Sequence, residues 1–137
     1  MRILIIEDNE SKYKTTLEYV KKVQPDAVIE WEQYAKGGVI RLINEHFDFV
    51  IVDMYMPINS DGRISREGGF YVLNYMSRTN NKFDLSTAVV NSSEATIRKK
   101  MNEKGFENVA FIHNSSMYDL TSEFKNFFSK DTKNDKG

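Results

Sequence analysis

Short apolar runs alternate along the chain with longer segments in which apolar residues recur every three or four positions. The short runs predict five β-strands, within residues 2–6, 27–31, 50–52, 87–90 and 109–112. The longer segments predict five helices, within residues 10–24, 33–45, 70–76, 94–104 and 117–129. This alternation predicts parallel βαβ units with right-handed crossovers, and therefore an α/β fold built on a doubly wound parallel sheet.

The apolar stripes of two helices identify the faces that should be buried. They comprise Val39, Ile40, Leu42 and Ile43 in the second helix, and Leu120, Phe124, Phe127 and Phe128 in the last. Ser116 can cap the last helix, and Gly105 ends the helix before it. We expect a single domain over residues 1–130, followed by a disordered tail over residues 131–137.

The composition is that of a globular protein. At 137 residues, with 40% apolar and 28% charged residues, the chain is long enough for one hydrophobic core. Its net charge of −1 indicates neither nucleic acid nor an acidic membrane surface as a partner. The chain has no cysteine, which excludes disulfides and thiolate metal sites. The N-terminal apolar run is too short for a signal peptide or a membrane span, so we expect a cytoplasmic protein without membrane insertion.

Acidic side chains follow two of the predicted strands. Glu7 and Asp8 end the first strand, and Asp53 ends the third, whose preceding residues are apolar and β-branched. A carboxylate at the end of a buried strand has to be solvated by a metal, another cation or an open cleft. Ligands of such sheets bind beyond the carboxyl ends of the strands, so we expect the three carboxylates to meet there. Ser92 and His113 follow the fourth and fifth strands.

Three neighbouring carboxylates repel one another unless a cation joins them. Because the chain has no cysteine and only two histidines, a hard, oxygen-liganded cation such as Mg²⁺ is the natural partner. Asp8 and Asp53 can bind it directly, and Glu7 can bind through water. A carboxylate beside Mg²⁺ can act as a nucleophile toward a phosphoryl group and form an aspartyl phosphate. Ser92 and His113 can then donate hydrogen bonds to phosphate oxygens.

Four motifs, in this order and spacing, carry a resemblance to a known family. They are ILIIEDN at residues 3–9, FDFVIVDMYMP at residues 47–57, the pair Gly68 and Gly69, and VVNSSE at residues 89–94. With these motifs the sequence resembles a response-regulator receiver domain over nearly its whole length, and we expect a stand-alone one. The resemblance implies a flavodoxin-like (βα)5 fold, with a five-stranded parallel sheet in the order 2-1-3-4-5.

The resemblance also implies a role for each residue of the site. Asp53 would be the phospho-acceptor, with Asp8 as a Mg²⁺ ligand and Glu7 as its partner. The backbone carbonyl of Tyr55 would be a further ligand, and Ser92 would bond the phosphoryl group. The donor would be a histidine kinase or a phosphotransfer protein, and the signal would pass to a downstream protein target. Enzymatic activity would be limited to self-phosphorylation from a phosphodonor and slow autodephosphorylation. Separately from the resemblance, a homodimer through the last strand and helix is left open.

The chain departs from the family at the fifth strand and in one loop. Receivers usually carry lysine and then proline at the end of the fifth strand, whereas this chain has His113 and Asn114. The aromatic switch position is Ala110, and the loop over residues 58–68 is longer than usual. These departures leave open a pseudo-receiver, a constitutive protein-interaction module that is not phosphorylated. A Mg²⁺-dependent phosphohydrolase is disfavoured, because Tyr55 stands where such enzymes usually carry a second aspartate.

Simpler roles are also open for two of these residues. Ser92 can serve only as the N-cap of the helix that follows it. His113, in place of the usual lysine, can merely satisfy backbone groups at the end of its strand. The long loop over residues 58–68 suggests a further hypothesis, in which it covers the site beside Asp53 and restricts access to it.

Overall fold

A computed structural model describes residues 1–78, 83–115 and 117–136 of the protein. Its centre is a five-stranded sheet in which all neighbouring strands run parallel. In spatial order, the strands are β2 (Val28–Glu32), β1 (Arg2–Ile6), β3 (Phe49–Val52), β6 (Ala88–Ser92) and β7 (Ala110–His113). Counting only these five strands along the chain, the order is 2-1-3-4-5, so the predicted fold class and strand order are confirmed.

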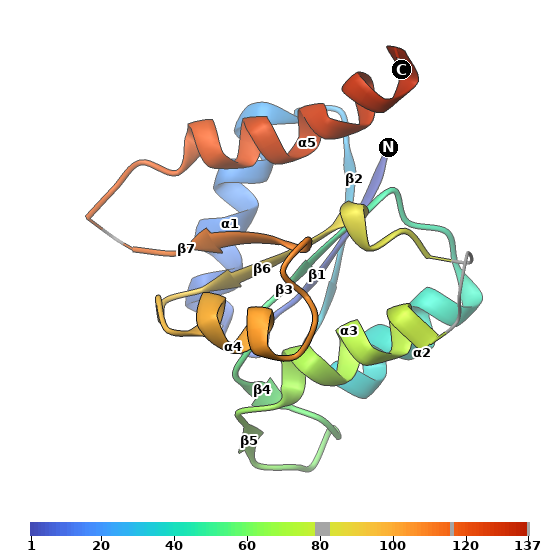
Figure 1. The fold of residues 1–137 in the computed structure, drawn as a ribbon, viewed down its shortest axis with the longest axis vertical. Coiled ribbons are helices and arrows are strands. Elements are labelled where there is room, and N and C mark those ends of the chain that lie inside the picture. The colour runs from blue at the N-terminus through green and yellow to red at the C-terminus, as the bar shows by residue number, and fades with distance from the viewer. Residues whose placement is uncertain (79–82, 116, 137) are drawn as a thin grey trace.

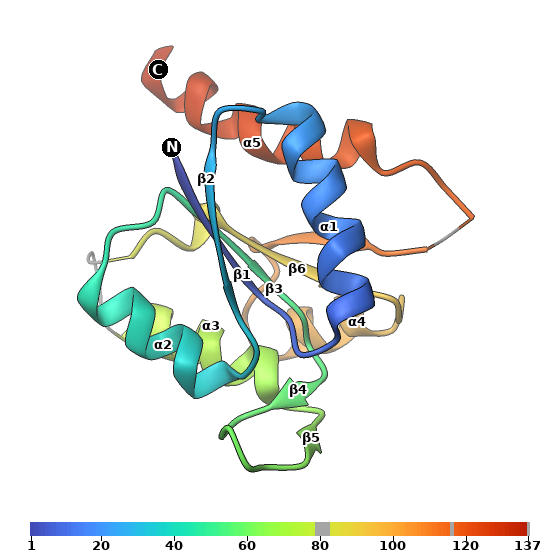
Figure 2. The ribbon, with the colours of Figure 1, turned by 180° about the vertical axis from the view of Figure 1, so that it is seen from behind.

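Helices cover both faces of the sheet (Figures 1 and 2). One face carries α1 (Glu10–Val23) and α5 (Thr121–Lys136), which pack against each other. The other face carries α2 (Ala35–Asn44), α3 (Gly68–Arg78) and α4 (Ile97–Glu103). A short 3-10 helix, η1 (Leu85–Thr87), precedes β6. Among the described residues, none of the helices has the length and apolar character needed to span a membrane.

The apolar core lies in two halves, one on each face of the sheet, because the side chains of a strand alternate between its faces. In one half, Phe49 of β3 makes edge contacts with Phe127 and Phe128 of α5, at ring-centroid distances of 5.2 and 5.1 Å. Phe124 is fully buried in the same half. The predicted core face of the last helix is therefore confirmed, and these aromatic rings are not available to a partner.

The predicted stripe of the second helix is only half right. Val39 and Leu42 are buried, as expected, whereas Ile40 and Ile43 are each 48% exposed. Ala35, Val39 and Leu42 follow one another at helical spacing and share the face that packs on the sheet and on α3. Ile40 and Ile43 lie on the adjacent face, which the neighbouring elements do not cover.

The polar segment predicted as a loop over residues 58–68 contains part of a small hairpin. Its strands are β4 (Met56–Pro57) and β5 (Ile64–Ser65), which pair antiparallel. In both views the hairpin lies apart from the helical layers, next to the start of α3 (Figures 1 and 2). Gly62 forms the turn, with its N–H donating to the carbonyl of Asn59 at 3.0 Å.

The last helix begins later than the sequence predicts. It starts at Thr121 rather than at residue 117, and the Asp119 side chain accepts a hydrogen bond from the backbone N–H of Thr121 at 2.9 Å. An aspartate just before a helix satisfies one of its free N–H groups, so Asp119 takes the part expected of Ser116. Ser116 itself lies outside the described residues. The helix continues to Lys136, into the segment assigned to a tail.

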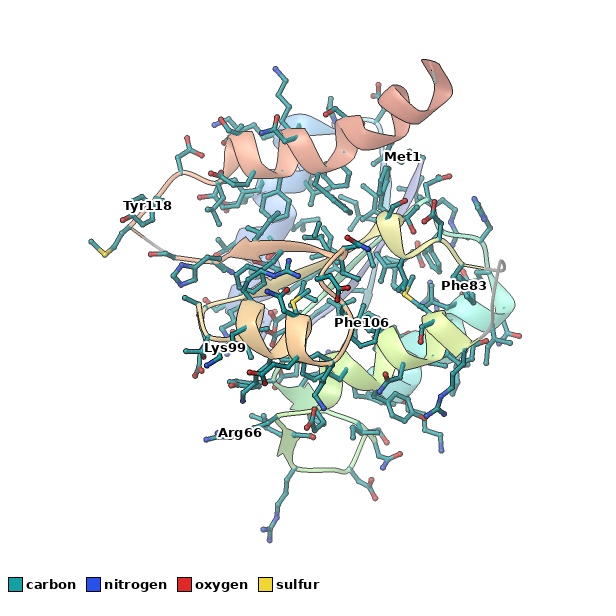
Figure 3. All side chains as sticks on the ribbon, in the orientation of Figure 1. Met1, Arg66, Phe83, Lys99, Phe106 and Tyr118 are labelled. Atoms are coloured by element: carbon teal, nitrogen blue, oxygen red, sulfur yellow. The ribbon has the colours of Figure 1, made fainter. Side chains whose placement is uncertain are left out.

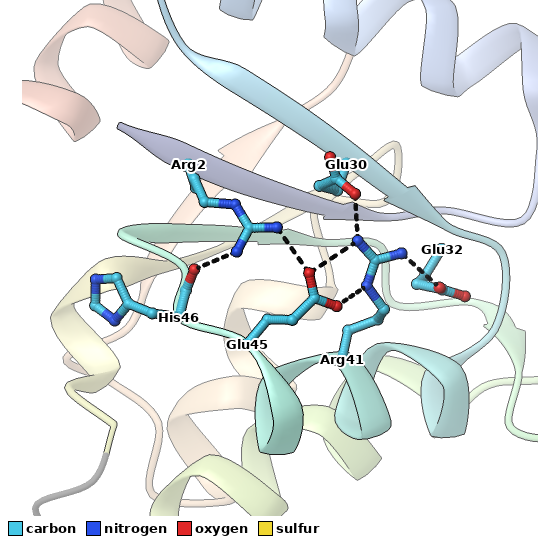
Figure 4. Close-up of polar contacts among 6 residues, drawn as sticks. All are labelled: Arg2, Glu30, Glu32, Arg41, Glu45 and His46. Carbon is cyan, nitrogen blue, oxygen red and sulfur yellow. Dashed lines mark hydrogen bonds and ion pairs between the residues drawn. The ribbon is translucent and has the colours of Figure 1, made fainter.

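A network of ion pairs joins α2 to the β2 edge of the sheet (Figure 4). The Arg41 guanidinium binds the carboxylates of Glu30, Glu32 and Glu45. Glu45 also pairs with Arg2 of β1, at 2.7 Å. The side chains of Arg41 and its partners are 21–32% exposed, which screens them less than free surface charges. The network orients α2 on the far side of the sheet from α1 and α5.

Gly69 permits the close approach of α3 to the end of β3. Its N–H donates to the carbonyl of Met54 at 2.9 Å, and a Cβ at this position would lie 2.8 Å from the Asp53 carbonyl oxygen. We expect Gly69→Ala to lower the free energy of unfolding by about 1–3 kcal/mol, because backbone rather than a flexible side chain has to move. Urea denaturation measures the change. Gly62→Ala, in the exposed turn, is the control, and an equal loss in both variants would contradict the explanation.

Candidate functional site

The register of the sheet brings the acidic residues together. Ile6 of β1 pairs with Val52 of β3, so the next residues, Glu7 and Asp53, lie side by side. The Asp53 N–H donates to the carbonyl of Ile6 at 3.0 Å. Carboxylate oxygens of Glu7, Asp8 and Asp53 all lie within 4.8 Å of one another. The predicted convergence of the three acids at the carboxyl edge of the sheet is therefore observed.

Burial makes this cluster electrostatically unfavourable without a cation. Glu7 is 3% exposed and Asp53 is 4% exposed. Burial, reinforced by the charge of Asp53, raises the pKa of Glu7 to about 9. Burial also raises the pKa of Asp53 to about 6, against a lowering effect of Lys12. At neutral pH and without metal, the pair therefore holds a proton that a divalent cation would displace.

The donor set fits a hard divalent cation. Asp53 Oδ2 is buried and has no hydrogen-bond partner among the described residues, so it is a free acceptor within the cluster. Three carboxylates within 4.8 Å offer the oxygen ligands that Mg²⁺ prefers. Asp8, which is only half-buried, leaves room for the waters that Mg²⁺ retains. The part of the Tyr55 carbonyl as a further ligand stays a prediction.

Ser92 and His113 end neighbouring strands, where β6 and β7 pair them in register. Ser92 is 3% exposed, and its Oγ accepts a hydrogen bond from the N–H of Glu94 at 3.2 Å. His113 is exposed, and its Nε2 lies 3.0 Å from the carbonyl oxygen of Ser93. Both side chains therefore contact the backbone of the β6–α4 loop. The Ser92 hydroxyl keeps its proton for a further bond, and phosphate binding by either residue stays a prediction.

Trp31 is a part of the site that the sequence does not reveal. Its indole N–H donates to the backbone carbonyl of Glu7 at 2.7 Å. The indole also stacks on the ring of Tyr13, with centroids 4.1 Å apart and planes within 3°. The ring thus fixes the backbone turn that carries Glu7 and Asp8. This contact joins β2 to the residue that follows β1, and only the pairing of the two strands brings them together.

Tyr55 and Glu94 connect two loops beside the acids. The Tyr55 hydroxyl donates to Glu94 Oε2 at 3.1 Å, although the two residues are 39 positions apart. The Arg66 guanidinium lies 6.0 Å from the centre of the Tyr55 ring. Arg66 directly follows β5, as Figure 3 shows. The hairpin is thereby tied to the rim of the site through Tyr55, and the hypothesis that it restricts access to Asp53 stays open.

No family model matches the chain, and no curated protein sequence matches it. Solved structures do match. A CheY-like receiver domain protein from Methanospirillum hungatei is similar over 99% of this chain and 98% of its own, with 17% identity and a TM-score of 0.70. The chain has the fold of a response-regulator receiver domain. The motif-based resemblance is thus confirmed at the level of the fold, and identity this low shows the fold alone.

Two further structures with the receiver fold contain metals. The response regulator TrrA from Thermotoga maritima, in complex with Mg²⁺-BeF, is 15% identical, with a TM-score of 0.69 over 92% of this chain and 97% of its own. The Mn²⁺-bound form of response regulator Rcp1 is also 15% identical, with a TM-score of 0.69 over 93% and 91%. The acid cluster of the present chain lies at the carboxyl ends of strands that this fold arranges in the same order.

The raised pKa of Glu7 leads to a prediction about stability. Its pKa is 4.5 in an ordinary setting and about 9 in the folded protein. Below about pH 4.5 the residue is protonated in both states, and above that the unfolded state releases its proton first. The metal-free protein should therefore lose stability as the pH rises toward 9, by at least about 1 kcal/mol, given about 1.4 kcal/mol per pKa unit.

Chemical denaturation of the metal-free protein between about pH 5 and pH 9 measures this slope. Glu7→Gln should flatten it, because the amide does not titrate. Glu103→Gln, an exposed residue at the end of α4, is the matched control and should leave the slope unchanged. Saturating Mg²⁺ should restore stability at the alkaline end, by about 2.7 kcal/mol at a hundredfold excess over its dissociation constant. A slope that Glu7→Gln does not alter would contradict the assignment.

Proposed function

We propose that the protein is a receiver domain that accepts a phosphoryl group on Asp53, with Mg²⁺ bound beside it, and signals through protein contacts. The observation that carries the proposal is the convergence of Glu7, Asp8 and Asp53 within 4.8 Å at the carboxyl edge of a sheet with receiver strand order. The unpartnered Asp53 Oδ2 supports it, because a buried acceptor without a hydrogen bond is available for bond formation.

The reaction requires one bond to form and one to break. A carboxylate oxygen of Asp53 attacks the phosphorus of a phosphohistidine, the O–P bond forms and the P–N bond breaks. The imidazole of the donor leaves and takes up a proton. When bound, Mg²⁺ neutralises charge on the phosphoryl group. Water later attacks the phosphorus and cleaves the O–P bond, which releases inorganic phosphate and restores the carboxylate.

The proposal includes partners and a location that stay predictions. The donor is a histidine kinase or a phosphotransfer protein, and the signal passes to a downstream protein target in the cytoplasm. A homodimer through β7 and α5 is one open assembly. The connection between these two elements offers Met117 and Tyr118, which are 83% and 65% exposed and large enough for a protein contact. Figure 3 shows Tyr118 projecting away from the body of the molecule.

Incubation with Mg²⁺ and a small phosphodonor, followed by intact-protein mass spectrometry, tests the proposal. The wild type should gain the mass of one phosphoryl group, and chelation of Mg²⁺ should prevent the gain. Asp53→Asn should abolish it, because an amide is not a nucleophile toward phosphorus. Asp61→Asn, in the exposed turn of the hairpin, is the control and should behave as the wild type does. An adduct that persists in Asp53→Asn would assign the acceptor elsewhere.

A constitutive interaction module is the second candidate, and the contacts of the last two strands favour it. His113 Nε2 lies 3.0 Å from the Ser93 carbonyl, and the Ser92 hydroxyl already binds the N–H of Glu94. These contacts hold the β6–α4 loop without a phosphoryl group. NMR spectra with Mg²⁺ and beryllofluoride separate the two functions. A phosphorylation switch should shift the amide signals of Ser92, β7 and α5, whereas a constitutive module should leave them unchanged.

A further inference from the structure

Lys12 occupies an unfavourable position for a cation unless it has an acidic partner. It lies in the first turn of α1, where its backbone N–H donates to the side chain of the N-cap residue Asn9 at 2.9 Å. The amino end of a helix carries partial positive charge, which repels a lysine and favours an acid. The N-cap residue Asn9 follows Asp8 in the chain, so the first turn of α1 begins at the end of the segment that carries Glu7 and Asp8.

The charge of Lys12 acts on both buried carboxyl groups. Its ammonium lowers the pKa of Asp53 and makes the largest contribution that opposes burial there. It also lowers the pKa of Glu7, although to a smaller extent than burial and Asp53 raise it. Asp53 Oδ2 is buried and lacks a hydrogen-bond partner among the described residues. The carboxylate of Asp53 thus has a hydrogen-bond acceptor without a partner among the described residues, and Lys12 is the cation that acts on it.

Lys12 also faces the loops that follow β6 and β7. It lines a cavity of about 290 Å³ together with Ser93 and Asn114. These residues directly follow Ser92 and His113, whose ring contacts the Ser93 carbonyl. Lys12 therefore lies against the loops that would flank a group attached to Asp53.

We propose that Lys12 binds the phosphoryl oxygens of the Asp53 adduct and serves as the fixed cation of the site. This assignment rests on the proposed phosphorylation of Asp53. Mg²⁺ offsets only part of the charge of three carboxylates, and a phosphoryl group adds more negative charge at the same place. An ammonium on a flexible four-carbon stem can reach that group.

If Lys12 binds the phosphoryl group on Asp53, its charge has opposite effects on the phosphoryl group and on Mg²⁺. It attracts the phosphoryl group and repels Mg²⁺ from the same carboxylates. Lys12→Met, which keeps the length of the side chain and removes its charge, should therefore slow phosphorylation and tighten Mg²⁺ binding. A merely structural role would weaken both, because the site would lose its shape. The opposite signs distinguish the two roles.

The experiment compares wild type, Lys12→Met, Lys12→Gln, Lys12→Arg and the control Lys14→Met. Lys14 lies in the same helix, its side chain is 68% exposed, and it pairs with Glu10 at 3.5 Å. Adduct formation from a small phosphodonor at saturating Mg²⁺ is followed by intact mass. Mg²⁺ affinity is followed by the fluorescence of Trp31, the single tryptophan, whose indole binds the Glu7 carbonyl. Thermal unfolding confirms that each variant is folded.

We expect Lys12→Met and Lys12→Gln to slow phosphorylation at least about tenfold, equivalent to ~1.4 kcal/mol in the barrier, and to bind Mg²⁺ severalfold more tightly. Lys12→Arg should retain most of the rate, and Lys14→Met should match the wild type. The role of Lys12 would be overturned if folded Lys12→Met and Lys12→Gln proteins react at the wild-type rate, or if they lose Mg²⁺ affinity together with rate. Either result would leave the proposed phosphorylation of Asp53 intact. A wild type that forms no adduct would overturn the proposed phosphorylation and this assignment with it.

Discussion

Two carboxyl groups, Glu7 and Asp53, are buried side by side where adjacent strands end, and much of the surrounding structure accommodates them. Apolar residues on both faces of β1 and β3 force these strands into the centre of the sheet, so the residues that follow are buried as well. Burial raises both pKa values, and the charge of Asp53 adds to the rise at Glu7. The chain therefore maintains, at one edge of an otherwise apolar core, a site whose acids favour either a shared proton or a cation.

The neighbours of this site come from separate segments and make different kinds of contact. Trp31 holds the backbone of Glu7, and Gly69 lets α3 approach the carbonyl of Asp53. Tyr55 and Glu94 bridge the loops after β3 and β6. The acids thus stand on rigid strand ends, while loops supply the groups around them, as is common in sites that bind ligands.

The β6–α4 loop is the segment in which a constitutive module and a phosphorylation switch would differ. The Ser92 hydroxyl binds a backbone N–H of this loop, and the His113 ring contacts one of its carbonyls. A phosphoryl group on Asp53 would offer oxygen acceptors to the same side chains. The size of a conformational change in the loop would then depend on one difference in free energy. This is the difference between binding of Ser92 and His113 to the phosphoryl oxygens and their binding to the loop backbone.

The sequence by itself determined the alternation of strands and helices and the acidic half of the site, because periodicity and strand ends are local signals. The order of the strands was implied only by the resemblance of its motifs to those of receiver domains. The apolar pattern misassigned Ile40 and Ile43, since both are apolar and only packing decides which helix face is covered. Tertiary structure alone decided the contacts of Trp31 with Glu7 and Tyr13, which depend on the pairing of β2 with β1 and on the docking of α1. The fold also placed Lys12 against the loops after β6 and β7, although its position in the first turn of a helix is a local signal.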